Sequence, residues 1–144
     1  MYKPDHFELH ELLPKDFYRE NMTKSFKLLW IFDQRALWTL DQLRNRYGSL
    51  IVNDWWWHGS NQYRGWRPFD CQTGSILSQH KFGRAFDCIF DDLSSEEVRQ
   101  DIKADPWRDE FKFITGIEDG ISWFHFDVRN WDKERRGLFI FKQT

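Results

Sequence analysis

The sequence has few of the residues from which disulfide-bonded or membrane-spanning proteins are built. Its 144 residues include two cysteines, Cys71 and Cys88, which are too few for a disulfide scaffold and lack CxxC spacing. Because nothing in the sequence indicates an oxidising compartment, we expect both to be free thiols. No apolar run approaches the roughly 20 residues that span a bilayer, and the N-terminus lacks the apolar stretch of a signal peptide. We therefore expect a protein that is cytoplasmic on synthesis and has no membrane partner.

Neither sign of charge dominates the chain. It has 23 acidic and 21 basic residues, interspersed along the sequence, and a formal net charge of −2. A nucleic-acid-binding protein needs a basic face, so this balance argues against a nucleic-acid partner. Alanine occurs only three times, whereas 14 Phe, 9 Trp and 4 Tyr supply large rings for a hydrophobic core. At this length we expect one domain, residues 1–144, and a monomer.

The spacing of apolar residues predicts both helices and strands. Between residues 23 and 47 they recur at intervals of three and four, which predicts an amphipathic helix with a break near Phe32–Asp33. Gly48 is a suitable stop for this helix. A capping-box pattern at Ser94–Glu97 predicts a second helix that ends near residue 104. Strands are expected at residues 50–53, 85–90, 112–117, 122–128 and 138–141, with a tight turn at 118–120.

Helical patterns come first and strand patterns dominate the second half, an order typical of the α+β class. We expect an N-terminal segment and helix over residues 1–48, and over 49–144 a core in which helices pack on an antiparallel sheet. Residues 55–79 are rich in Gly, Ser, Asn, Gln and Pro, and loops of this length are usually functional or disordered. The tryptophans beside this loop either stack on sugar rings or pack into the core. They are Trp55, Trp56, Trp57 and Trp66.

Two polar residues after this loop are notable for the small residues between them. His80 and Asp87 lie seven residues apart, with Gly83 and Ala85 between them. Small residues among bulky ones indicate that another part of the chain approaches the backbone closely. If the chain turns at the glycine, a loop histidine and a strand carboxylate can converge on one metal ion.

A third candidate, His125, lies in a predicted strand between Phe124 and Phe126. Successive side chains of a strand point to opposite faces, so His125 shares its face with Trp123 and Asp127 rather than with the two phenylalanines. A polar pair that faces a core needs partners. A bound metal ion is one way to supply them.

Two neutral imidazoles and one carboxylate form a donor set that suits a catalytic zinc ion, with a fourth position left for water. The spacing alone leaves an alternative open, in which the histidines are satisfied polar residues and the aspartate is an ordinary surface carboxylate. The remaining histidines, His6, His10 and His58, lie in irregular segments or follow the tryptophan run. We expect them to be surface or packing residues.

The two motifs together resemble a known family. Ser78-x-His80-x-x-Gly83-x-Ala85-x-Asp87, followed by Trp123-Phe-His125-Phe-Asp127, is similar to the zinc D-Ala-D-Ala metallopeptidases. This group includes D-alanyl-D-alanine carboxypeptidases and dipeptidases, bacteriophage endolysins and the Hedgehog signalling domain. The resemblance covers roughly residues 50–130 and implies a Hedgehog/DD-peptidase-like fold. It also implies that His80, Asp87 and His125 bind one zinc ion per chain, and that Arg67 and Ser78 bind substrate.

One position departs from the pattern of this family. Many relatives place the catalytic carboxylate three residues before the last histidine ligand, where this chain has Ser122. The nearest acids are Glu118 and Asp119, in the predicted turn, and one of them is the expected general base unless both are only turn residues. We expect Asp127 to orient a ligand or Arg129 from outside the ligand set.

The resemblance implies a zinc-dependent peptidase that hydrolyses an amide bond in the stem peptide of peptidoglycan. The activity would be that of a D-Ala-D-Ala carboxypeptidase or of an endolysin-type endopeptidase, which share these ligands. Without an export signal, a phage-encoded enzyme released by lysis or carried by the virion fits best. The alternative is a non-catalytic zinc module with a structural or partner-binding role, as in Hedgehog-type domains.

Overall fold

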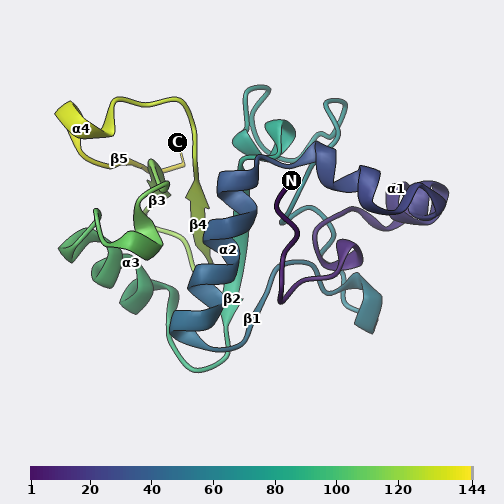
Figure 1. Ribbon diagram of the computed structural model, residues 1–144, viewed down its shortest axis with the longest axis horizontal. Coiled ribbons are helices and arrows are strands. Elements are labelled where there is room, and N and C mark those ends of the chain that lie inside the picture. Colours follow the sequence, from purple (N-terminus) through teal and green to yellow (C-terminus); the bar gives the residue numbers. More distant parts are fainter. Residues whose placement is uncertain (144) are drawn as a thin grey trace.

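The computed structural model describes residues 1–143 and consists of helices and a mixed five-stranded sheet, which confirms the α+β class (Figure 1). The α-helices are α1 (Lys15–Asn21), α2 (Gln34–Tyr47), α3 (Ser95–Ala104) and α4 (Lys133–Arg136). The strands are β1 (Leu50–Ile51), β2 (Ala85–Phe90), β3 (Gly116–Glu118), β4 (Phe124–Asp127) and β5 (Phe139–Phe141). Short 3₁₀ helices span Leu9–Glu11, Met22–Ile31, Trp55–Trp57, Gln79–Phe82 and Asp109–Phe111. Within the described residues, no helix is both long and apolar enough to cross a membrane.

The predicted helix over residues 23–47 is divided where the sequence indicated a break. Its first part is a 3₁₀ helix with a kink at Ser25, where φ is 55°, and its second part is α2. Phe32 is extended between them, and the Asp33 side chain accepts a hydrogen bond from the backbone N–H of Arg35 at 2.9 Å. This contact caps the new helix start. Gly48, with φ of 84°, ends α2 as expected.

The sheet has the strand order β1-β2-β4-β3-β5, and its first three pairings are antiparallel. The expectation of a wholly antiparallel sheet is wrong for the last strand, because β5 runs parallel to β3. After β4 the chain continues through α4 and passes β3 before it re-enters the sheet on the far side of that strand. β5 runs in the opposite direction to β4 and, because β4 is antiparallel to β3, it lies parallel to β3.

The strand predicted over residues 112–117 begins later than expected. A 3₁₀ turn at Asp109–Phe111 buries the ring of Phe111 first, and β3 starts only at Gly116. Consequently Glu118 is the last residue of a strand rather than a turn residue. The turn follows it, with Gly120 at a φ of 76°.

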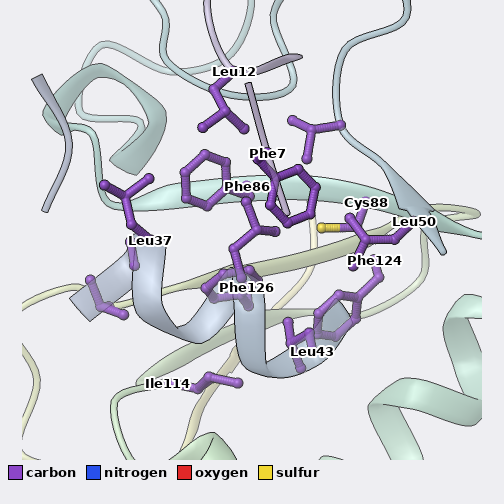
Figure 2. Close-up of a cluster of buried hydrophobic side chains, with 14 of the residues drawn as sticks. Phe7, Leu12, Leu37, Leu43, Leu50, Phe86, Cys88, Ile114, Phe124 and Phe126 are labelled. Carbon is purple, nitrogen blue, oxygen red and sulfur yellow. The ribbon is translucent and has the colours of Figure 1, made fainter. Parts of the chain in front are cut away.

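The core lies between α2 and one face of the sheet and is built from large rings (Figure 2). Phe124 and Phe126 of β4 and Phe86 of β2 are fully buried beside Leu37 and Leu43 of α2. The core cluster draws on both the N-terminal segment and the later strands, and Cys88 lies within it as a free thiol. Because alternate residues face the core, the residues between the phenylalanines are turned to the other face of the sheet.

Candidate metal centre

The register of β2 and β4 places Asp87 directly opposite His125. Nδ1 of His125 lies 2.8 Å from Oδ1 of Asp87. His80 approaches the same oxygen from the 3₁₀ helix Gln79–Phe82, with its Nε2 at 3.2 Å. That helix ends at Gly83, where φ is 68° and a Cβ would lie 2.1 Å from the backbone oxygen of Ile31. The close approach that the small residue predicted is therefore present, and it turns the chain from His80 into β2.

The outward nitrogen of each imidazole has its own hydrogen-bond partner. Nδ1 of His80 lies 2.8 Å from the backbone carbonyl oxygen of Gly65, and Nε2 of His125 lies 2.9 Å from Oδ2 of Asp127. When these nitrogens donate, the lone pairs of the other two nitrogens face Asp87. Partners of this kind fix the tautomer and orientation of histidines that bind metals. Asp127 thus has the orienting position expected from the sequence, and it also binds Arg129 at 2.6 Å.

His80, Asp87 and His125 are all buried and form the group that can hold a metal ion among the described residues. One donor atom from each residue lies within 4.8 Å of the others. Two imidazole nitrogens and one carboxylate oxygen are a donor set that zinc accepts, with a further coordination position left free. The residues therefore fit a three-ligand metal site.

The ionisable side chains of this group shift one another's pKa values. Burial of His125 opposes its charged form, but its hydrogen bonds to Asp127 and Asp87 outweigh this effect and raise its pKa to about 9. Burial likewise opposes the charged form of Asp87, yet the two histidines hold the pKa of this carboxyl below its usual range. Burial lowers the pKa of His80, which favours its neutral form. Each carboxylate also has a cationic partner, because Arg67 lies 3.3 Å from Asp87 and Arg129 lies 2.6 Å from Asp127. A metal ion bound here would take the place of the proton between His125 and Asp87.

Arg67 and Ser78 lie at the edge of this group, as expected. Nη2 of Arg67 lies 3.3 Å from Oδ2 of Asp87, and its Nε donates to the carbonyl oxygen of Tyr63 at 2.6 Å. A longer contact of 3.5 Å joins its Nη1 to Oγ of Ser78. The Gly74 backbone passes so close that a Cβ there would lie 2.5 Å from Nη1 of Arg67. The guanidinium is therefore held in the site rather than exposed.

The two candidate bases have different environments. Glu118 is 4% exposed and lines the same pocket as the histidines, and within residues 1–143 its Oε1 has no hydrogen-bond partner. Burial raises its pKa. Asp119 instead binds Nζ of Lys103 on α3 with both carboxylate oxygens, at 2.8 and 2.9 Å. The structure thus brings Glu118, but not Asp119, to the candidate site.

The pocket above these residues has a volume of about 580 Å³. Sequence reasoning did not identify its C-terminal wall, to which Arg129, Phe139 and Phe141 contribute. The Arg129 guanidinium carbon lies 4.7 Å from the centroids of both phenylalanine rings. Arg129 follows Asp127 by two residues, just beyond the end of β4, and this proximity in the sequence was the one local signal for the wall. The contribution of β5 depends on its pairing with β3, and no local pattern reveals that pairing.

The four tryptophans near the long loop do not line this pocket. Trp55 is buried, and Trp66 is partly buried against the core, with its ring centroid 4.7 Å from that of Phe17. Trp56 and Trp57 remain 47% and 55% exposed. Packing therefore accounts for Trp55 and Trp66, but it does not account for Trp56 and Trp57.

Comparison of this chain with protein-family models, with curated proteins and with solved structures finds no match. The case for a function consequently depends on the geometry of the site and on the motif resemblance.

Proposed function

We propose that this protein is a zinc-dependent peptidase that hydrolyses an amide bond in the stem peptide of peptidoglycan. The observation that carries the proposal is the buried His80–Asp87–His125 group at the base of an open pocket. Arg67 and Glu118 line the same pocket. A metal ion that activates water and a carboxylate that accepts its proton are groups that can hydrolyse a peptide, and a cation can position the substrate. The resemblance of the two motifs to the zinc D-Ala-D-Ala metallopeptidases supplies the substrate class.

His80, Asp87 and His125 would hold the zinc ion, with Asp127 and the Gly65 carbonyl orienting the two imidazoles. When bound, zinc supplies Lewis-acid chemistry that lowers the pKa of water and polarises a carbonyl group. Glu118 would accept a proton from water and return it to the leaving amine, a role supported by its buried Oε1 in the pocket wall. Burial raises its pKa and so strengthens it as a proton acceptor.

Arg67 would bind the carboxylate of the substrate. Its guanidinium is fixed by Tyr63 and Asp87 and faces the pocket. A guanidinium can form two parallel charge-assisted hydrogen bonds with a carboxylate, which would hold the scissile amide in a fixed position. A D-amino acid at the end of a stem peptide carries such a carboxylate. A phage-encoded lysin is the setting we propose for this activity.

Digestion of purified peptidoglycan by the zinc-loaded protein, followed by mass spectrometry of the released fragments, tests the proposal. Loss of one D-alanine identifies a carboxypeptidase, and cleavage between cross-linked stems identifies an endopeptidase. The matched control is Glu118→Gln, which should retain zinc and release no fragments above background. If the zinc-loaded wild type releases no fragments either, the protein is instead the non-catalytic zinc module.

A further inference from the structure

A second pocket, of about 400 Å³, lies beside α1, at the opposite end of the molecule from α4 in Figure 1. It shares no lining residue with the metal pocket. Its walls come from α1 and from the 3₁₀ turn Trp55–Trp57 with the residues that follow. The lining residues are Lys15, Arg19, Trp55, Trp56, His58 and Gly59.

Two cations face this pocket without acidic partners. Lys15 and Arg19 lie four residues apart on α1, so they share one face of the helix. Like charges at this spacing repel each other, which destabilises a helix unless an anion lies between them. Neither side chain belongs to an ion pair within residues 1–143, and no acidic residue lines the pocket. The pair therefore offers two positive charges to a negative group in the pocket.

The aromatic side of the pocket is held rigidly. Trp55 is 6% exposed, and its Nε1–H donates to the Leu13 carbonyl oxygen at 2.8 Å. The His10 ring stacks on Trp56 with 4.2 Å between centroids and an interplanar angle of 16°. This contact fixes the indole of Trp56 while nearly half of that side chain remains exposed, at 47%. An exposed, immobilised indole face can bind a flat apolar surface with little loss of side-chain entropy.

The turn that carries these tryptophans is also fixed. The backbone N–H of Gly59 donates to the carbonyl oxygen of Asp54 at 3.0 Å, and a Cβ at Gly59 would lie 2.1 Å from a carboxylate oxygen of Asp54. His58 takes the left-handed conformation with φ of 69°, which is uncommon for a residue other than glycine. The chain thus adopts an energetically unfavourable backbone conformation at His58, which lines this side of the pocket.

We propose that this pocket binds an acidic sugar. A pyranose ring would stack on the Trp56 indole, and a carboxylate or phosphate on the ring would be bound by Lys15 and Arg19. A polynucleotide fits less well, because binding along a strand requires a track of cations and successive stacking platforms, whereas this chain has a net charge of −2. The proposal does not depend on the peptidase activity. If both hold, the pocket would tether the enzyme to a glycan strand.

Ligand-observed NMR titration with four small probes tests this inference. N-acetylmuramic acid carries ring and carboxylate, N-acetylglucosamine 6-phosphate carries ring and phosphate, N-acetylglucosamine carries the ring alone, and lactate the acid alone. We expect at least one acidic sugar to bind about tenfold or more tightly than either the neutral sugar or lactate, since one charge-assisted contact accounts for this difference. The acidic sugar that binds more tightly shows whether the pocket prefers a carboxylate or a phosphate.

Variants separate the two contributions to binding. Trp56→Ala should abolish binding of all sugars, and Arg19→Gln should reduce acidic-sugar binding to the level of the neutral sugar. Trp107→Ala, which changes a tryptophan that is 51% exposed and lines neither pocket, is the matched control and should bind as the wild type does. His80→Ala should also retain sugar binding, so failure of the metal site and failure of this pocket are distinguishable.

Three results would overturn the inference. The first is equal affinity for the neutral and acidic sugars, and the second is undiminished binding by Trp56→Ala with an unchanged thermal midpoint. The third is tighter binding of a thymidine oligonucleotide than of any sugar, which would identify the pocket as a nucleic-acid site.

Discussion

Asp87 and His125 are register partners across β2 and β4, and Oδ1 of the first lies 2.8 Å from Nδ1 of the second. Backbone pairing of the two strands therefore assembles most of the metal site. The two residues are 38 positions apart in the sequence, and both are buried. The third residue of the candidate group, His80, lies outside this pair of strands, and the turn at Gly83 brings it to the same oxygen.

The first prediction concerns metal content. We expect the wild type to bind about one zinc ion per chain, and alanine variants of His80, Asp87 and His125 to lose it, since a three-ligand site has no spare donor. Inductively coupled plasma mass spectrometry of the purified proteins measures this directly. His6→Ala changes an exposed histidine outside the group and should keep its zinc. Unchanged zinc in any of the three ligand variants removes that residue from the site.

The second prediction distinguishes Glu118, the last residue of β3, from Asp119, which follows it. Glu118→Gln should lower the turnover rate by about 10²–10⁴-fold with zinc retained, as expected for loss of a general base. Asp119→Asn should keep the wild-type turnover, because Asp119 binds Lys103 rather than the pocket. Loss of that partly exposed ion pair should cost about 0.2–1 kcal/mol of stability. Steady-state kinetics and thermal unfolding of both variants provide the comparison, and wild-type turnover by Glu118→Gln would exclude it as the base.

The third prediction concerns substrate binding. Arg67→Lys keeps the charge but loses the planar fork, so we expect kcat/KM to fall by about tenfold or more. In the structure Arg67 forms an ion pair with Asp87, so the substitution also affects the candidate metal group. Kinetics on a stem peptide should be measured together with zinc content and the thermal midpoint. Normal kcat/KM with a lowered midpoint would mean that Arg67 supports Asp87 and does not bind substrate.

Local patterns were sufficient to predict the elements that hold the ligands. The β2 strand and α3 begin and end close to their predicted positions, and the capping box at Ser94–Glu97 is present. The alternation around His125 correctly placed this residue on the opposite face of the strand from Phe124 and Phe126, which the structure shows to be the core residues. Each of these features depends on residues that are neighbours in the sequence.

Features that depend on distant pairing were not predictable. The parallel pairing of β5 with β3 and the late start of β3 both result from how segments far apart in the sequence pack together. For the same reason the sequence could not choose between Glu118 and Asp119. Their environments are set by the pocket and by Lys103 of α3, respectively.

The last prediction tests whether the backbone of β3 controls the metal site. Gly116 is the register partner of Asp127, and a Cβ at Gly116 would lie 2.3 Å from Oδ1 of Asp127. The carboxylate would have to move, although it is fully buried and binds His125 and Arg129.

We therefore expect Gly116→Ala to weaken zinc binding by about 10–100-fold, as losses of such orienting partners typically do. Asp127→Asn should have an effect of similar size, because it removes the negative charge of the same carboxylate beside His125. Competition with a chromogenic chelator measures both affinities, and Ile140→Ala on the exposed side of β5 serves as the control. If Gly116→Ala binds zinc as tightly as the wild type while Asp127→Asn does not, the carboxylate can relax around the added methyl group. In that case the glycine is required for the strand and not for the metal.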